Sequence, residues 1–424
     1  MRTDREGIVA EFEEPTTTER IELANGLRVL VEFVPGVRTA SVGLWIETGS
    51  RDEPEPWQGI SHFLEHAVFK GTRKRRTHQI AQYLESVGGY VNAFTTKDHT
   101  CFYARLLDAH LERAVDLLAD LALHPTFPER EVARERQVIL EEMHLYEDTP
   151  DELALDLFDE VLFEGHPLAH PIVGRPDTVS ALGPEELHAY KARQYRPGRM
   201  ILTFAGPFCL SKVLPLVERY FGEADNAGPA PLERLPVNGY NPYWRERTRA
   251  IGQAHLVMGT RAPGMRDAEQ HALAVLAALL GGGMSSILNQ RIRERYGFCY
   301  AIYAFYHGWS DVGQFGIYAG VEAAKLERLI KLIWQELDRL RQAPPKARLL
   351  EQAKAQLKGS LWMGLEGTQA RMMRLGKDEL YYRRPVPLSE VLAGIEAVTP
   401  EAVQRLAQEL FREERFSGVL LKPE

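Results

Sequence analysis

A stretch rich in glycine and proline, residues 222–243, divides this 424-residue chain almost in half. It holds three glycines and four prolines, a composition typical of a linker. A chain of this length exceeds what one hydrophobic core supports, so more than one domain is expected. We therefore predict a first domain over residues 1–222, a linker over 223–243 and a second domain over 244–424.

The second half repeats the order of elements of the first half, with few identical residues. A strand over residues 39–47 leads to Gly49-Ser-Arg-Asp and a helix, and a strand over 253–260 leads to Gly264-Met-Arg-Asp and a helix. The first helix carries two histidines, whereas the second reads Ala272-Leu-Ala-Val-Leu-Ala-Ala-Leu-Leu and offers no ligand for a metal. These matches predict a duplicated α/β unit in which the first copy alone holds a metal site.

Composition excludes several classes of protein. The formal net charge of -8 argues against a primary role on nucleic acid or on an anionic membrane. Cys101, Cys209 and Cys299 lie far apart and form no Cys-x-x-Cys pair, which fits a reducing compartment. Residues 1–7 contain no apolar signal segment, and no apolar run approaches the roughly 18 residues that span a bilayer. We expect a soluble cytoplasmic protein.

The pattern with the clearest chemistry is His62-Phe-Leu-Glu-His66. An apolar stripe at helical spacing predicts a helix here, formed by Ile60, Phe63, Leu64, Ala67 and Val68. On a helix, His62 and His66 lie one turn apart on one face and can bind one zinc ion, with the Glu65 carboxylate beside a metal-bound water. The alternative is a surface helix that carries two histidines by coincidence.

Another pair of histidines, His166 and His170, has the same spacing of four. Pro167 and Pro171 disfavour a helix at this place, so the two imidazoles are not expected to converge on a metal. We interpret this segment as a loop whose histidines are structural or exposed.

A catalytic zinc site needs a third protein ligand, in addition to the two histidines. Downstream, Pro128 opens a predicted helix that presents Glu131, Glu135 and Glu142 along one side. Solvent-exposed charges are the usual explanation for such a glutamate-rich face. The residues alone do not decide which carboxylate is the ligand.

Together, these segments resemble the pitrilysin-type inverzincin metallopeptidases, a family that includes insulysin and the mitochondrial processing peptidase. The resemblance rests on His62-Phe-Leu-Glu-His66, followed 76 positions later by Glu142 within Arg136-Gln-Val-Ile-Leu-Glu-Glu-Met143. It implies that His62, His66 and Glu142 bind zinc, that Glu65 is the general base and that Glu135 orients the site from behind the ligands. It also implies an α+β chain of two homologous units, each a mostly antiparallel sheet with helices on one face, forming a clam-shell.

Two further segments carry the resemblance. Asn92, Ala93 and Phe94 resemble the edge strand on which the family lays its substrate, where backbone pairing holds an extended peptide. Gly281-Gly-Gly-Met-Ser-Ser286 resembles the turn that precedes the family's Arg-x6-Tyr pair, present here as Arg293 and Tyr300. The resemblance implies that Arg293 binds a substrate carbonyl and that Tyr300 donates a hydrogen bond to the developing oxyanion.

The implied activity is hydrolysis of peptides and unfolded segments by a zinc-dependent endopeptidase with one Zn2+ per chain. Family members either join four α/β units in a longer chain or pair two chains of this size. Two units therefore imply a dimer around an enclosed chamber, in which Arg293 and Tyr300 reach the zinc of the partner chain. Because the ligands and the Arg–Tyr pair are both present, a homodimer is favoured over a heterodimer with a related chain.

Three other functions stay open. A presequence-processing peptidase acting on basic N-terminal segments would share every catalytic residue and differ in its substrate profile. A non-catalytic scaffold of the same fold, as in the core subunits of respiratory complexes, would lack zinc ligands, and all three are present here. A metal-dependent hydrolase acting on small molecules is disfavoured by the match at residues 92–94.

Overall fold

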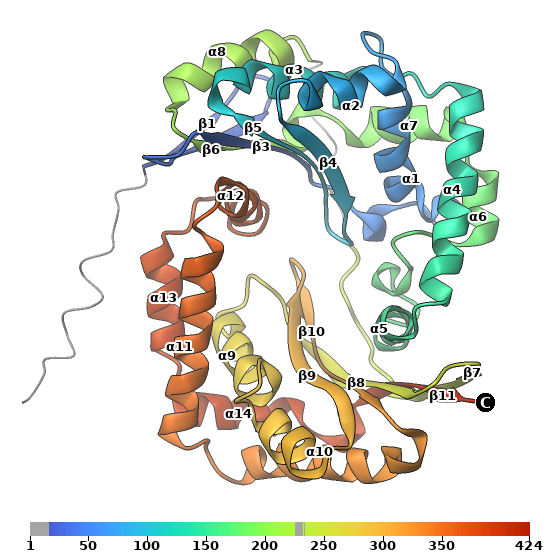
Figure 1. The fold of residues 1–424 in the computed structure, drawn as a ribbon, viewed down its shortest axis with the longest axis vertical. Helices are drawn as coiled ribbons and strands as arrows, with labels where there is room; N and C mark the ends of the chain where they lie inside the picture. The colour runs from blue at the N-terminus through green and yellow to red at the C-terminus, as the bar shows by residue number, and fades with distance from the viewer. Residues whose placement is uncertain (1–16, 225–231, 233) are drawn as a thin grey trace, which may run out of the picture.

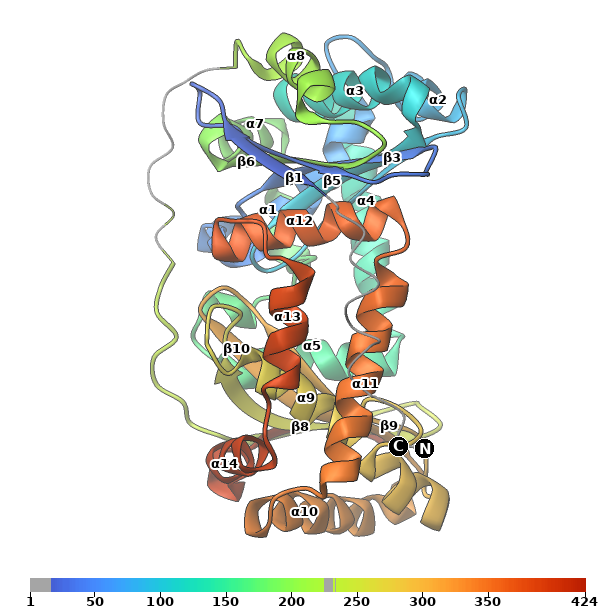
Figure 2. The same cartoon turned by 90° about the vertical axis from the view of Figure 1, so that its left-hand side faces the viewer.

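The computed structural model describes residues 17–224, 232 and 234–424, which form two halves that face each other (Figure 1). Each half is built on one β-sheet, and the sheets lie on either side of the predicted linker. Part of that linker, residues 225–231 and 233, lies outside the described residues, as do residues 1–16 of the predicted first domain. Residues 234–243 run as an extended segment along one side of the molecule (Figure 2). The domain limits themselves stay a prediction.

The first half contains a six-stranded sheet in the order β1-β2-β6-β3-β5-β4. β2 and β6 are parallel, and the other neighbours are antiparallel. Its strands are β1 (Thr18–Glu22), β2 (Arg28–Phe33), β3 (Thr39–Ile46), β4 (Tyr90–Thr95), β5 (Thr100–Leu107) and β6 (Met200–Gly206). Its helices are α1 (Ile60–Ala67), α2 (Thr77–Glu85), α3 (Leu111–Leu123), α4 (Glu129–Glu147), α5 (Pro150–Leu162), α6 (Pro176–Ala181), α7 (Pro184–Gln194) and α8 (Leu210–Phe221).

The second half contains a five-stranded sheet in the order β7-β11-β8-β10-β9, in which β7 and β11 are parallel and the other neighbours are antiparallel. Its strands are β7 (Trp244–Arg249), β8 (Ala254–Pro263), β9 (Cys299–Gly308), β10 (Val312–Val321) and β11 (Ser417–Pro423). Its helices are α9 (Gln270–Gly281), α10 (Leu326–Gln342), α11 (Ala347–Gly364), α12 (Thr368–Tyr382), α13 (Leu388–Glu396) and α14 (Pro400–Leu410).

The two sheets have the same topology. Taken along each sheet, β7, β11, β8, β10 and β9 occupy the positions of β2, β6, β3, β5 and β4, with the same parallel and antiparallel neighbours. Among the described strands, β1 alone has no counterpart. In both halves the third strand of this series leads through a Gly-x-Arg-Asp segment into a helix, α1 or α9. The predicted duplication and the α+β fold are confirmed.

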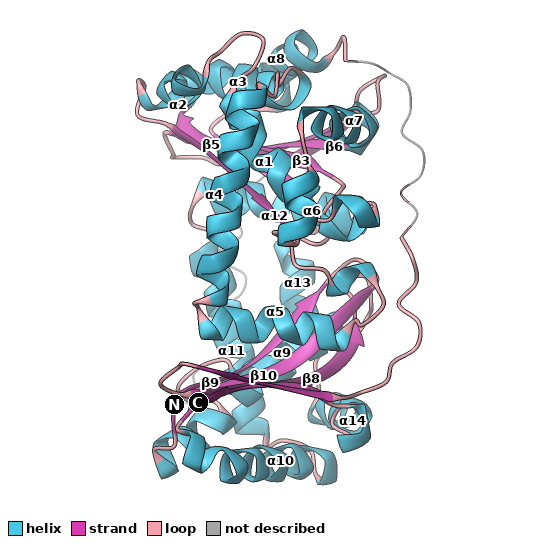
Figure 3. Cartoon of the chain, turned by 90° about the vertical axis from the view of Figure 1, so that its right-hand side faces the viewer, coloured by secondary structure: helices cyan, strands magenta, loops and turns pink. Residues whose placement is uncertain are grey.

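Each half packs its own helices on one face of its sheet, and the opposite face is covered by a helix from the other half (Figures 1 and 3). α12 supplies Met372 and Leu375 to a core cluster with Leu30 and Trp45 of the first sheet. α5 supplies Leu157 and other apolar residues to a cluster that includes Val257 and Val419 of the second sheet. The sequence did not predict this exchange of helices.

Buried charges reinforce the contact between α12 and the first sheet. Glu379, which is fully buried, accepts two hydrogen bonds of 2.9 Å from the Arg20 guanidinium and also pairs with Arg28 at 3.4 Å. Arg371 pairs with Glu32 at 2.7 Å. Because removal of one partner would leave the other charge buried, these pairs hold the two halves in a fixed arrangement.

Within the described residues, no helix is both long and apolar enough to cross a membrane.

Candidate metal centre and active site

Helix α1 carries the His62-Phe-Leu-Glu-His66 pattern, and it has the helical conformation that the apolar spacing predicts. Phe63 and Leu64 are fully buried in the core of the first half. His62 and His66 are one turn apart, with ring centroids separated by 4.5 Å. Packing of the apolar face therefore fixes the position of both imidazoles.

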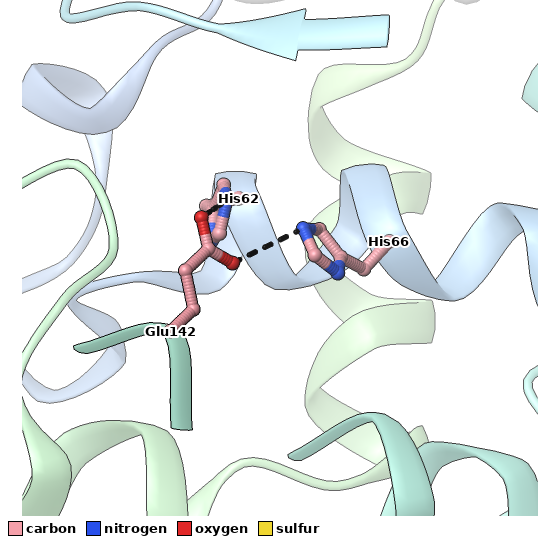
Figure 4. A group of neighbouring side chains, drawn as sticks. All are labelled: His62, His66 and Glu142. Carbon is pink, nitrogen blue, oxygen red and sulfur yellow. Dashed lines mark ion pairs between the residues drawn. The ribbon is translucent and has the colours of Figure 1, made fainter. Parts of the chain in front are cut away.

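Helix α4 brings Glu142 to the two histidines (Figure 4). Its carboxylate oxygens lie 3.7 Å from the Nε2 atom of His62 and 3.7 Å from that of His66. The three ligand atoms lie within 4.8 Å of one another. Zinc at about 2.0–2.2 Å from each ligand needs ligand atoms roughly 3.3 Å apart. The separations are too long for hydrogen bonds, and the donor set fits a single zinc ion.

The electrostatics of the two imidazoles differ. Burial, aided by the neighbouring His66, lowers the pKa of His62 to about 3, so this ring is neutral and free to bind a metal. Burial also acts to lower the pKa of His66, but the hydrogen bond with Glu135 and the charges of Glu65, Glu142 and Glu135 outweigh it and raise that pKa. The negative surroundings that favour a proton on His66 also favour a bound divalent cation.

Glu135 contacts His66 from the side away from Glu142. Its Oε1 atom lies 3.0 Å from Nδ1 of His66, which leaves Nε2 of that ring to face Glu142. Lys70 pairs with the other carboxylate oxygen of Glu135 at 2.7 Å. Such a carboxylate fixes the tautomer and orientation of a ligating histidine. Glu135 thus has the geometry of a supporting residue rather than of a ligand.

Glu65 is buried beside the two histidines, and a threonine of β4 fixes its orientation. The Thr95 hydroxyl donates a hydrogen bond of 2.6 Å to Oε2 of Glu65. Burial raises the pKa of Glu65, the Thr95 hydrogen bond and His66 lower it, and Glu142 raises it. A carboxylate whose pKa is raised towards neutrality is suited to accept and return a proton.

Known proteins resemble this chain over most of its length. The family model described as insulinase (peptidase family M16) matches residues 28–175, and the peptidase M16 inactive domain matches residues 181–357. An uncharacterized zinc protease of Bacillus subtilis is 37% identical over 405 residues, which cover 96% of this chain and 98% of that protein. The chain belongs to peptidase family M16. A probable mitochondrial-processing peptidase subunit beta of Arabidopsis thaliana is 33% identical over 91% of this chain and 74% of that protein.

Solved structures share the fold of this M16 chain. A protease from Helicobacter pylori superimposes with a TM-score of 0.91 and 23% identity, covering 96% of this chain and 100% of that one. A peptidase M16 inactive domain from Pseudomonas fluorescens gives a TM-score of 0.89 with 21% identity, covering 96% and 98% of the two chains. The two-sheet architecture is therefore that of M16 proteins.

The predicted substrate-strand residues lie next to the metal group. Asn92, Ala93 and Phe94 belong to β4, which is an edge strand of the first sheet. β4 also ends at Thr95, the residue that hydrogen-bonds Glu65. The edge strand and the metal group are therefore neighbours, and the binding of substrate by Asn92, Ala93 and Phe94 stays a prediction.

Arg293 and Tyr300 lie in the second half of the same M16 chain, on a π-helix over Asn289–Glu294 and on the edge strand β9. Tyr300 is 82% exposed. In the described part of the chain, no hydrogen bond or ion pair joins either residue to His62, His66 or Glu142. Within the described residues of one chain, this pair thus makes no direct bond to the metal group.

The other pair of histidines is separated, as predicted. His166 contacts the Leu235 carbonyl at 3.0 Å and His170 contacts the Gln58 amide at 3.1 Å. They flank a short 3-10 turn over Pro167–Ala169 rather than sharing a helical face.

Sequence reasoning missed two residues that support the site, Thr95 and Lys70. Each lies next to a segment with a predicted role. Thr95 follows Phe94 of the predicted substrate strand, and Lys70 lies four positions after the predicted ligand His66. Their contacts with Glu65 and Glu135 depend on how α1, β4 and α4 pack, which no local pattern indicates.

Proposed function

We propose that this chain is a zinc-dependent endopeptidase that hydrolyses peptides and unfolded polypeptide segments. The observation that supports this proposal most strongly is the convergence of His62, His66 and Glu142, with Glu65 held beside them. Each of the two helices that supply the ligands is anchored in the core, so the donor set is preorganised for one Zn2+. A cytoplasmic location remains a prediction from the sequence.

The residues have distinct roles in the proposed reaction. When bound, zinc supplies a Lewis acid that activates water and polarises a peptide carbonyl. Glu65 accepts the proton of the attacking water and passes it to the leaving amine, while Thr95 keeps its carboxylate oriented. Glu135 holds His66 in the orientation needed for binding. The edge of β4 pairs with the substrate backbone, so cleavage depends little on substrate side chains.

We also propose that two copies assemble around an enclosed chamber, so that Arg293 and Tyr300 of one copy serve the metal centre of the other. The exposure of Tyr300 and its place in the second half support this arrangement. Arg293 binds a substrate carbonyl there, and Tyr300 donates a hydrogen bond to the oxyanion. The chain carries both sets of residues, which favours a homodimer over a heterodimer with a related chain. Nucleic acid and membranes are not expected partners.

Cleavage of an unstructured, internally quenched peptide is expected to depend on bound metal. Removal of zinc with a chelator should abolish the increase in fluorescence, because the Lewis acid is lost, and added Zn2+ should restore it. Zinc content and oligomeric size are measured on the same sample. A zinc-loaded dimer that cleaves no unstructured peptide would contradict the peptidase proposal and favour a scaffold role.

An acidic face of α5 supports a second candidate, a presequence-type processing peptidase that cleaves beside basic residues. Burial is the largest cause that raises the pKa of Tyr146, and the charges of Glu142, Glu152 and Asp156 raise it further. Glu152 and Asp156 on α5 therefore lie close enough to Tyr146 for their charges to act on its hydroxyl, as the charge of Glu142 does. A cationic substrate side chain close to the cleaved bond would be attracted to them.

This second candidate predicts a preference that two peptides can measure. Peptides that differ by one Arg-to-Gln replacement near the cleaved bond should differ in kcat/KM by about 5-fold, as expected for a partly exposed ion pair of about 1 kcal/mol. The double variant Glu152→Gln/Asp156→Asn should lose most of this difference. Asp151→Asn, an exposed carboxylate of the same helix, should retain it. Equal rates for both peptides with the unmodified chain would favour a general oligopeptidase.

A further inference from the structure

The backbone at the start of α1 is held by Glu53, a residue of the loop that precedes the helix. The Gly59 N–H donates a hydrogen bond of 2.7 Å to Oε2 of Glu53, and the Ser61 N–H donates one of 2.8 Å to Oε1. Both carboxylate oxygens are thus engaged with the first turn of the helix that carries His62 and His66.

Helix α1 depends on such an outside acceptor. The first N–H groups of a helix have no partner within it, and the residue before Ile60 is Gly59, which has no side chain to accept them. Gly59 has a φ of +92°, a conformation that side-chain-bearing residues such as serine or aspartate rarely adopt. A carboxylate at this position also interacts favourably with the helix dipole.

The contact bears directly on a metal ligand, because His62 follows Ser61 in the chain. The Ser61 hydroxyl is paired with the Tyr190 hydroxyl of α7 at 2.8 Å. Ser61 is therefore held at its backbone by Glu53 and at its side chain by Tyr190. With Ser61 fixed on both sides, the backbone of His62 has little freedom to move relative to Glu142 on α4.

The loop that presents Glu53 is itself fixed. Arg51 pairs with Asp98 at 3.1 Å and with Asp311 of the second half at 2.6 Å. Asp52 pairs with Arg234 at 2.9 Å. The residues that precede Glu53 thus connect the start of α1 to the second half and to the segment between the halves. Glu53 therefore contacts α1 from a loop that is itself anchored by residues outside α1.

We propose that Glu53 is a positioning residue of the metal centre, which holds the first turn of α1 so that His62 meets His66 and Glu142 at one point. The proposal rests on metal binding by these three residues, as proposed above. Burial raises the pKa of Glu53 to about 8, against the opposing effect of its two backbone hydrogen bonds. The carboxylate is therefore tested at pH 8.5, above that pKa.

The variant Glu53→Gln tests this role, since glutamine keeps the size but turns an amide N–H2 towards one of the two backbone donors. The zinc dissociation constant of the full chain, measured by competition with a chromophoric chelator, is expected to rise about 10- to 100-fold, as for other residues that support metal ligands. Glu53→Asp is the second variant, because it keeps the charge but is too short to reach both N–H groups; we expect a smaller rise.

A matched control comes from the same half. Glu19 accepts a hydrogen bond of 2.8 Å from the Leu210 N–H at the start of α8, which carries no ligand. Glu19→Gln removes a backbone contact at a helix start as well, but it should leave zinc affinity unchanged. Unchanged zinc affinity in folded Glu53→Gln or Glu53→Asp would overturn the positioning role. Failure of the unmodified chain to bind zinc would instead overturn the metal site itself.

Discussion

Replacing Glu65 by glutamine is expected to lower kcat by about 10²–10⁴-fold, the usual contribution of a general acid–base group. Glutamine has the same shape and can still accept the hydrogen bond from Thr95, but it cannot take a proton from water. Since Glu65 is not among the three residues that converge on the metal position, zinc content should stay at one ion per chain. The measurement is kcat on a quenched peptide, together with zinc content of the same preparation.

The control for Glu65→Gln is Glu141→Gln. Glu141 lies beside Glu142 on α4 but is exposed, so its replacement removes a carboxylate near the site without affecting the proposed chemistry. It should keep kcat within about 2-fold, as most exposed substitutions do. Full activity in Glu65→Gln would assign the proton transfer to another group, and loss of zinc in that variant would make Glu65 part of the metal site.

Mixing two inactive variants is expected to restore activity if Arg293 and Tyr300 act on the metal centre of the partner chain. Glu65→Gln lacks the base, and Tyr300→Phe lacks the proposed oxyanion donor. A mixed dimer contains one site with an intact Glu65 from one chain and an intact Tyr300 from the other. With random exchange of equal amounts, half of the dimers are mixed and half of their sites are intact, which gives about one quarter of the original activity.

A matched mixture separates this arrangement from simple contamination. Glu65→Gln and Glu142→Gln both alter residues of the first half, which one chain must supply together. Their mixed dimer has no intact site, so no activity should return. Activity in the second mixture, or none in the first despite proven exchange of chains, would contradict the arrangement across the dimer. A monomer with full activity, as judged by light scattering, would contradict the dimer.

Much of the fold follows from local patterns in the sequence. Local patterns predicted strands β3 and β8 and the helices α1 and α9 that follow them. For α1 the signal was apolar spacing at the helical period, because that period puts the apolar side chains on one buried face. The repeated Gly-x-Arg-Asp segment predicted the duplication, which the shared strand order of the two sheets confirms. The crossing of α5 and α12 to the opposite sheets left no such signal. An amphipathic helix shows which face is buried, but not which sheet buries it.

In the metal site, too, the sequence predicted some features and the packing of the helices decided others. The sequence by itself determined that His62 and His66 share a face with Glu65 beside them, since the helical period fixes neighbours within one turn. The residues left three glutamates open as the third ligand, and the resemblance chose Glu142. That Glu142 lies 3.7 Å from both histidines was decided by the packing of α4 on α1.

The tertiary structure alone decided which residues support the ligands. Three such contacts join different segments of the chain, so no local repeat of side chains predicts them. Thr95 contacts Glu65, Lys70 contacts Glu135, and Glu53 contacts the start of α1. Their geometry depends on side-chain packing among α1, β4, α4 and the loop before α1, and packing is a property of the assembled core. Local spacing therefore determined what chemistry this chain can carry, and the long-range packing of its elements decided which groups hold that chemistry in place.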